Sequence, residues 1–318
     1  MAGFKYPKGS EWRKWDLHVH TPHTKLDNGY VVSADKDIWD KFCEKIERSD
    51  VEVIGITDYF SADNYSTFLK RYQDKYPDSI KSFFLNIEVR LNESVNKGLE
   101  EVNVHLLFNH CSLENVDKFL SKLNVVKTGI DERPITCSDL KTEADFKAAS
   151  VTRKSIDDAF IETFGKKAIR QDHFLVLTAA NNDGIRPERG KHRKEAITDE
   201  IDKFSDGFFG GIQNQNHFLN IHRLEDKEQL IGKKPVVAGS DAHSFDDLEN
   251  YLGKRVVEKD AEGKEIITKD ITWIKADPTF EGLKQIFYEP EPCERVCIGP
   301  IEPDQKDGYR VIRKIKFN

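Results

Sequence analysis

Two histidines separated by one residue, His18 and His20, end an apolar segment near the start of this 318-residue chain. In a β-strand, alternate side chains point to the same face, so both imidazoles are expected on one face and Val19 on the other. Neutral imidazoles at this spacing are common ligands of transition metals. Because such a pair also occurs in structural or exposed positions, a metal site requires further ligands elsewhere in the chain.

Other apolar segments also lead to metal-compatible side chains. These side chains are Asp58, Glu88, His105, Asp241 and His243. Asp241 and His243 repeat the i, i+2 spacing, and a buried Glu88 would be costly without a partner. Functional groups of α/β proteins gather at the C-terminal ends of parallel strands, so we expect all five near the histidine pair. For any one of them alone, a core residue or a turn cap is the competing interpretation.

The spacing of apolar residues predicts the elements that position these groups. Strands are expected over 15–20, 51–57, 82–88, 102–108, 173–179, 207–212, 235–239 and 271–275. Helices are expected over 35–49 and 114–124, and a short one is expected after Asp277 as its N-cap. Strands that alternate with helices predict an α/β protein with a largely parallel sheet, open or closed as a barrel.

Three segments depart from this alternation. Residues 125–170 are polar with few long apolar runs, which predicts an inserted helical subdomain or a mobile excursion. Residues 254–270 predict a charged hairpin around Glu262 and Gly263. Residues 309–318 alternate as a strand up to the last residue, so we expect either that the natural chain continues or that this strand pairs with a partner.

Composition and cysteine content indicate a globular protein of a reducing compartment. Hydrophobic residues make up 38% and charged residues 33% of the chain. No apolar run approaches the roughly 20 residues that span a bilayer, and the N-terminus lacks the apolar core of a signal peptide. Cys293 and Cys297 lie four residues apart, but no second pair completes a zinc knuckle, so we expect all five cysteines to be reduced. The expected location is cytoplasmic.

The net charge of −7 argues against a protein that coats nucleic acid without sequence preference, although a local basic rim is compatible with it. Basic residues cluster at 190–194 and 310–316, and each cluster has a solvated face as its competing interpretation. Arg186 lies in the loop that precedes the first cluster, after the expected strand 173–179. A guanidinium there suits bidentate capture of a phosphate, with an exposed charged loop as the alternative.

The order of these motifs resembles the PHP (polymerase and histidinol phosphatase) superfamily. The matching stretches are 16–21, 56–58, 87–89, 104–105 and 239–243. Members of that family fold as a distorted (β/α)7 barrel, bind up to three divalent metals at the strand C-termini and hydrolyse phosphoesters. The resemblance therefore implies a barrel of PHP type over residues 1–300, with the helical, polar insertion around 125–170.

Residues 9–22 and 272–283 resemble, more narrowly, TrlF-like proteins, in which a PHP domain precedes an AAA- or SMC-like ATPase. The phosphate-binding loop of an ATPase does not occur in these 318 residues. We therefore expect residues 301–318 to lead towards an absent ATPase domain or to pair with a partner. The resemblance also implies an ATPase partner, a nucleic acid or nucleotide substrate, and a role in defence against phages or plasmids.

The resemblance also implies roles for single residues. A first metal would be held by His18, His20, Glu88 and Asp241. Glu88 would bridge to a second metal with His105, and His243 would serve a third metal or touch the substrate. A histidine-rich set favours zinc, manganese or iron over magnesium. Two such ions lower the pKa of a shared water and neutralise charge on a phosphoryl group.

The chain departs from the family pattern at three positions. Tyr59 stands where the family has a histidine ligand of the third metal, and Asn181 lies where a later histidine is expected. The acidic ligand that follows the first motif is matched by Asp27 at a longer spacing, with His23 as a competing candidate. One or two metals are therefore expected.

Three functions follow from these observations. The first is a metal-dependent phosphoesterase or nuclease, in which metal-bound hydroxide attacks a phosphoester and Asp58, His243 and Arg186 are the catalytic candidates. The second is a catalytically weakened module that assembles with an ATPase, which Tyr59 favours. The third is an amidohydrolase-like enzyme acting on a carbon–nitrogen bond, although the bridging lysine of that family has no clear counterpart here.

Overall fold

A computed structural model describes residues 11–34, 37–95, 101–109, 113–127, 135–181, 184–185 and 195–303. The expected strand over 309–318 lies outside these residues, and so do Arg186 and the basic cluster 190–194. Of the expected C-terminal segment 301–318, only 301–303 are described.

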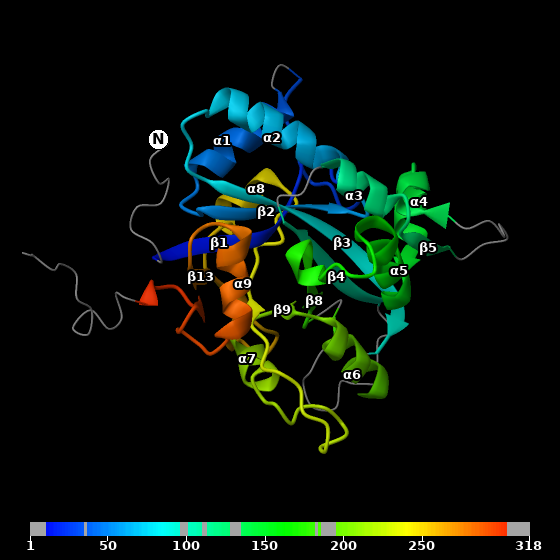
Figure 1. Cartoon of the computed structure of the whole chain (residues 1–318). Helices are drawn as coiled ribbons and strands as arrows, with labels where there is room; N and C mark the ends of the chain where they lie inside the picture. Colours follow the sequence, from blue (N-terminus) through cyan, green and yellow to red (C-terminus); the bar gives the residue numbers. More distant parts are fainter. Residues whose placement is uncertain are drawn as a thin grey trace, which may run out of the picture.

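The described residues form one large sheet whose main path has nine strands (Figure 1). In spatial order these are β10 (Val236–Val237), β9 (Gly207–Phe209), β8 (Phe174–Ala179), β4 (Glu101–Phe108), β3 (Ser82–Ser94), β2 (Val53–Tyr59), β1 (Trp12–His20), β13 (Thr272–Lys275) and β14 (Val296–Ile298). β1, β2 and β3 run parallel, as do β8, β9 and β10, whereas β4 is antiparallel to both its neighbours.

The ring from β1 to β10 is nearly closed. Beyond β10, Ala242 forms a parallel bridge with Val19 of β1, so that seven strands surround a common interior. The predicted distorted barrel is therefore confirmed. Its main irregularity is β4, because an apolar run in the sequence does not reveal the direction in which a strand crosses the sheet.

Helices pack on the outside of the ring. They are α1 (Ile38–Arg48), α2 (Asp63–Lys75), α3 (Leu113–Leu120), α6 (Glu195–Phe204), α7 (Ile212–Phe218) and α8 (Phe245–Asn250). Figure 1 shows α1 and α2 side by side along β1 to β3. The helical spacing of Ile38, Trp39, Phe42 and Ile46 predicts this helix, and α1 buries the last three, whereas Ile38 is partly buried.

A last helix, α9 (Phe280–Tyr288), closes one end of the interior. Phe280, Leu283 and Ile286 pack against apolar side chains that point inwards from the strands. Its N-cap is Thr279, whose side chain accepts a hydrogen bond from the backbone N–H of Gly282. The helix thus begins two residues later than expected, because the hydroxyl of Thr279 caps it instead of Asp277.

The predicted helical insertion contains strands as well as helices. Its elements are β5 (Asn124–Lys127), β6 (Ile135–Thr136), η1 (Cys137–Asp139), α4 (Glu143–Ala148), β7 (Ala149–Val151), α5 (Arg153–Phe164) and η2 (Arg170–Asp172). β7 pairs with the far end of β3, and Phe146 and Ile156 are buried in the main core. The segment is therefore an extension of the sheet rather than a polar excursion. Strands of two to four residues are too short for periodicity to reveal.

The charged hairpin is confirmed as β11 (Val256–Lys259) and β12 (Glu265–Lys269), with Gly263 at a positive φ of 80° in the turn. The expectation of reduced cysteines is wrong for one pair. Cys293 and Cys297 form a disulfide across a tight turn, with their Cα atoms 4.5 Å apart and Cys293 at a positive φ of 62°. Cys43 and Cys137 are free and buried. No described helix combines the length and the apolar character needed to cross a bilayer.

Side chains alternate between the ring interior and the outer layer. On β3, Phe84 belongs to the inner apolar cluster, and Asn86 and Glu88 follow on the same face. On β4, Leu107 and His105 share the inner face in the same way. The interior is therefore apolar near α9 and polar at the opposite end, where the parallel strands finish.

Candidate metal centre

An irregularity in β1 directs both histidines of the first motif inwards. The register between β1 and β2 shifts between Asp16 and Val19. Leu17 packs in the inner apolar cluster and Val19 packs in the outer one, as the strand alternation predicted for Val19. Gly55 on β2 accommodates the shifted strand, because a Cβ at this position would lie 2.2 Å from the Leu17 carbonyl oxygen.

The segment after β10 carries Asp241 and His243 to the end of β1. The backbone N–H of Asp241 donates to the carbonyl of His18 at 2.9 Å, and that of His20 donates to the carbonyl of Ala242 at 3.0 Å. Asp241 has a positive φ of 53°. Two sequence-distant motifs are thus held together by backbone pairing.

The side chain of Asp16 links the backbones of the two segments at this junction. Its two carboxylate oxygens accept hydrogen bonds from the backbone N–H of Ser240 at 3.1 and 3.0 Å, and Oδ1 also accepts from the N–H of His18. Gly239 lies so close to β1 that an added Cβ would be 2.8 Å from the Cβ of His18. The position therefore requires a residue without a side chain.

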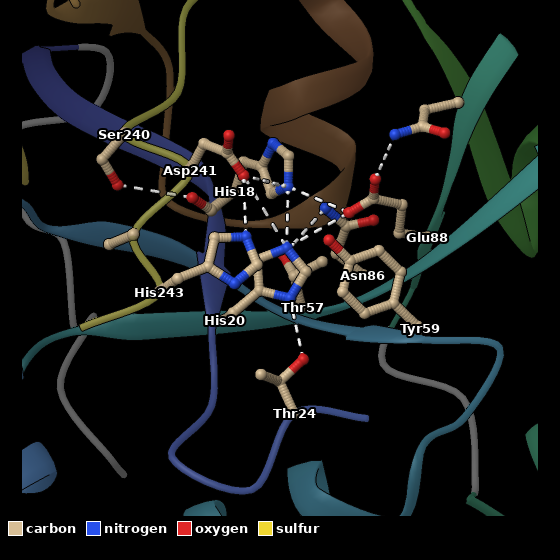
Figure 2. Close-up of polar contacts among 12 residues, drawn as sticks. His18, His20, Thr24, Thr57, Tyr59, Asn86, Glu88, Ser240, Asp241 and His243 are labelled. Atoms are coloured by element: carbon tan, nitrogen blue, oxygen red, sulfur yellow. Dashed lines mark hydrogen bonds and ion pairs between the residues drawn. The ribbon is translucent and has the colours of Figure 1, made fainter. Parts of the chain in front are cut away.

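Four donor atoms converge at this junction (Figure 2). His18 Nε2 lies 3.1 Å from His20 Nε2, 3.1 Å from Glu88 Oε2 and 3.2 Å from Asp241 Oδ1. His20 Nε2 lies 3.2 Å from Glu88 Oε2 and 3.8 Å from Asp241 Oδ1. Ligands of a tetrahedral zinc ion at 2.0–2.1 Å are about 3.3–3.4 Å apart. His18, His20 and Glu88 form one group whose separations fit a metal ion, and Asp241 Oδ1 lies close to both histidines but is grouped with His20 and His243.

The hydrogen bonds behind His20 fix its tautomer. Its Nδ1 lies 3.1 Å from the hydroxyl of Thr24, and that hydroxyl donates to Asp58 Oδ1 at 3.2 Å. Because a hydroxyl has one proton, Thr24 accepts the proton of His20 Nδ1. The lone pair of Nε2 therefore faces Glu88 Oε2, another acceptor. Such a contact is stabilised by a cation between the two atoms.

Burial and charge act on the ionisable groups of the centre in opposite directions. Burial would raise the pKa of Glu88, but the neighbouring His105, His18 and His20 lower it well below its ordinary value. The pKa of Asp241 is also lowered, against burial, chiefly by His18. Burial lowers the pKa of His20 to about 4. Two carboxylates and an uncharged imidazole therefore meet at one point, which suits a divalent cation.

His243 joins His20 and Asp241 in a second group of potential ligands. Its Nε2 lies 3.3 Å from Asp241 Oδ1, and its ring stacks on His20 with centroids 3.9 Å apart. Its Nδ1 is buried and has no hydrogen-bond partner in the described part of the chain. A buried polar atom without a partner fits a site that receives a ligand.

Tyr59 fills the position where the resemblance expects a third-metal histidine. Its ring stacks on His20 with centroids 4.7 Å apart and is largely buried. Burial raises the pKa of its phenol, so the hydroxyl is neutral. The residue therefore packs against a ligand instead of supplying a charged one.

His105 lies beside the centre but outside both donor groups. It pairs with Glu88 across the sheet, and its Nδ1 lies 3.1 Å from Asn86 Nδ2. The second oxygen of Glu88, Oε1, accepts a hydrogen bond from Asn103 Nδ2 at 2.7 Å. Because β4 runs antiparallel to β3, the first half of β4 lies at the end of the ring where Glu88 lies. His105 therefore reaches the centre from the middle of its strand and not from the strand's C-terminal end.

The remaining predicted residues are dispersed. Asp58 is buried behind His20, where it accepts hydrogen bonds from the backbone N–H groups of Lys25 and Tyr59. Asp27 is exposed and lines the mouth of the cavity, and it belongs to neither donor group. The competing His23 packs against Trp39, with centroids 5.4 Å apart.

Two supporting residues escaped the sequence reasoning. Thr24 bonds to His20 from four residues further along the chain, in a loop whose path no pattern predicts. Asn103 precedes His105 by two residues and therefore shares its face of β4, which was a usable signal. Asn181, which lies where a later histidine is expected, lines the cavity, and its Oδ1 accepts a hydrogen bond from Asn214 at 3.0 Å.

The centre opens into a cavity of about 780 Å³. Its walls include the amides Asn103, Asn181 and Gln213, the ring of Phe209, and residues 267–270 of the hairpin. This volume accommodates a small organic molecule or part of a larger one. The arrangement places the candidate metal-binding cluster at the base of an open, largely polar pocket.

The sequence matches no protein-family model and no curated protein. Among solved structures, one similar chain is a two-domain protein from Bacteroides vulgatus ATCC 8482 that contains a predicted PHP-like metal-dependent phosphoesterase. The identity is 12% and the TM-score 0.45, over 92% of this chain and 66% of that one, so this chain spans just under two thirds of its length.

Another similar chain comes from Bifidobacterium adolescentis ATCC 15703 and is assigned by prediction to the metal-dependent phosphoesterases. It shares 13% identity at a TM-score of 0.37, over 88% of this chain and 97% of that one. At these identities and TM-scores, neither protein assigns an activity to this chain.

Proposed function

We propose that this chain is a metal-dependent phosphoesterase of PHP type that binds one or two zinc, manganese or iron ions. The observation that carries the proposal is the convergence of His18, His20, Glu88 and Asp241. The lone pair of His20 Nε2 faces a carboxylate oxygen at 3.2 Å, and three further donor pairs lie 3.1–3.2 Å apart. A cation between His18, His20 and Glu88 would satisfy these three groups, and Asp241 lies close enough to both histidines to serve as a further ligand.

The chain's own residues hold the ligands in place. Thr24 and Asp58 keep His20 in the tautomer that presents Nε2, and Asn103 orients Glu88 through its outer oxygen. When bound, a divalent ion supplies a nucleophile from water near neutral pH and stabilises charge on a phosphoryl oxygen. His243, which is 19% exposed and borders the cavity, is placed to accept or donate a proton at the reacting group.

The proposal also covers the substrate and the partner, for which the support is the sequence resemblance. We propose a nucleic acid or nucleotide substrate, an AAA- or SMC-like ATPase as domain or separate chain, and a cytoplasmic role in defence. The resemblance of residues 9–22 and 272–283 to TrlF-like proteins supports these assignments. A basic rim for nucleic acid would come from Arg186 and its neighbours, which lie outside the described residues.

The test uses purified protein loaded with Mn²⁺ or Zn²⁺. We expect hydrolysis of bis(p-nitrophenyl) phosphate or a labelled oligonucleotide, abolished together with bound metal in the His18→Ala/His20→Ala double variant. His222→Ala, which removes an exposed histidine away from the cavity, is the matched control and should retain both. Failure of the loaded protein to cleave any phosphoester, with unchanged metal content in the double variant, contradicts the proposal.

Tyr59 supports a second candidate, a catalytically weakened module that assembles with an ATPase. Its ring packs on His20 where a ligand of a third metal is expected. This candidate predicts a protein that hydrolyses no phosphoester with any of the three metals and still associates tightly with an ATPase chain.

A further inference from the structure

The β11–β12 hairpin forms one wall of the cavity. Ile267, Thr268, Lys269 and Asp270 line it. The register between β11 and β12 shifts at Thr268, between Ile267 and Lys269, so this end of β12 does not follow regular alternation and consecutive side chains reach the cavity. The hairpin is a separate two-stranded sheet that is not paired with the strands of the ring.

Lys269 approaches the candidate metal centre from this wall. Its Nζ lies 3.9 Å from Asp241 Oδ2, while the other oxygen of that carboxylate, Oδ1, faces His18, His20 and His243. The ammonium also lies 5.6 Å from the centroid of Tyr251, and the side chain is 24% exposed. It is therefore directed towards the centre and still accessible from the cavity.

The charges of the cavity wall give this lysine a distinct role. The described lining carries four carboxylates, on Asp27, Glu88, Asp241 and Asp270, and Lys269 is its single lysine or arginine. A phosphoester is an anion and would be repelled by such a wall. Metal ions offset part of that repulsion, and the ammonium of Lys269 offsets more as a compact charge that binds phosphate well.

We propose that Lys269 contacts the phosphoryl group of the substrate, from the side of the centre where Asp241 lies. This inference rests on the proposed function, because it assumes a phosphoester as the substrate. It assigns the hairpin a role in substrate recognition and makes Lys269 a phosphate-binding residue of the site.

Inorganic phosphate is the probe, titrated calorimetrically into Mn²⁺-loaded protein whose metal content is measured by mass spectrometry. Lys269→Gln should weaken phosphate binding about tenfold or more, since a charge-assisted hydrogen bond is lost, and Lys269→Arg should restore part of it. Lys264→Gln removes the same charge from the exposed tip of the same hairpin and should leave binding unchanged. All variants should retain the bound metal.

Three results overturn the inference: phosphate binding that is unaffected in Lys269→Gln, binding that is weakened equally in Lys264→Gln, or loss of metal from Lys269→Gln. The last result would make the lysine a support for Asp241. If the loaded protein binds phosphate through Lys269 but hydrolyses no phosphoester, the proposed function fails, and only the assignment of Lys269 as a phosphate-binding residue stands. If hydrolysis is observed and its KM is the same in Lys269→Gln, the inference fails and the function stands.

Discussion

The ring nitrogen Nδ1 of His20 lies 3.1 Å from the hydroxyl oxygen of Thr24. This contact places the proton of His20 on Nδ1. The lone pair of Nε2 is therefore available to a metal ion on the side of the other candidate ligands. The same hydroxyl donates a hydrogen bond to Asp58. A carboxylate thus supports the candidate ligand through Thr24, as in many metal sites. The described residues therefore include a candidate metal ligand, His20, and the two residues that orient it, Thr24 and Asp58.

Removing the Thr24 hydroxyl should weaken metal binding. In Thr24→Val the proton of His20 Nδ1 loses its acceptor, and we expect metal affinity to fall about 10- to 100-fold. Competition against a fluorescent zinc chelator measures this change. Thr21→Val is the matched control, because the Thr21 hydroxyl is equally buried and has no hydrogen-bond partner within the described residues. Equal affinities of the two variants would contradict the role of Thr24.

The pH dependence of stability should report the burial of Asp58. Burial raises its pKa to about 6 from 3.8, so the folded state binds the proton more tightly than the unfolded state. Its contribution to stability is therefore full below pH 3.8 and is lost as the pH rises to 6. Asp58→Asn does not titrate, so the free energy of unfolding of the wild type minus that of the variant should fall by up to about 3 kcal/mol across this window.

Urea unfolding in EDTA between pH 4 and 7 measures this difference. Asp63→Asn provides a contrast, because the hydrogen bond from Lys25 and the charge of that lysine, acting against burial, lower the pKa of Asp63. Its stabilising contribution is fully present above pH 3.8 and is lost only at lower pH, so the difference for Asp63→Asn should stay nearly flat between pH 4 and 7. A difference for Asp58→Asn that stays flat or rises with pH would show that this carboxyl is not buried as described.

A methyl group at Gly239 should disturb the junction between β1 and the segment that carries Asp241. The added Cβ would lie 2.8 Å from that of His18, so one of the two strands must move. We expect Gly239→Ala to lose bound metal and to destabilise the fold by about 1–3 kcal/mol. In Gly232→Ala, the control, the added Cβ meets nothing within 4 Å. Calorimetric melting together with metal analysis checks both, and unchanged metal content in Gly239→Ala would refute the close approach.

Strand alternation predicted the close approach of the candidate ligands from the sequence. His18, His20, Glu88 and Asp241 each lie in or just after an apolar strand, and the ends of parallel strands converge in space. The order of apolar strands and helices along the chain likewise predicted an α/β sheet, open or closed as a barrel. The position of Val19 behind the histidine pair was also predictable, since it depends on neighbouring residues only.

Features set by long-range geometry escaped prediction. The shift within β1 lies against Gly55, which leaves room for it, and no local pattern encodes it. The antiparallel course of β4 placed His105 against Asn86 and outside the donor groups. Asp58 was predicted to be catalytic, whereas it lies behind His20, because the loop that carries Thr24 passes between them. Its catalytic role stays a prediction.

Anomalous scattering from a crystal grown with Zn²⁺ or Mn²⁺ tests the central claim most directly. We predict a metal peak within about 2.0–2.2 Å of His18 Nε2, His20 Nε2, Glu88 Oε2 and Asp241 Oδ1. A second peak beside His243 would extend the centre to two ions. A crystal that shows no peak at this junction, with the four side chains still in mutual contact, would contradict the account.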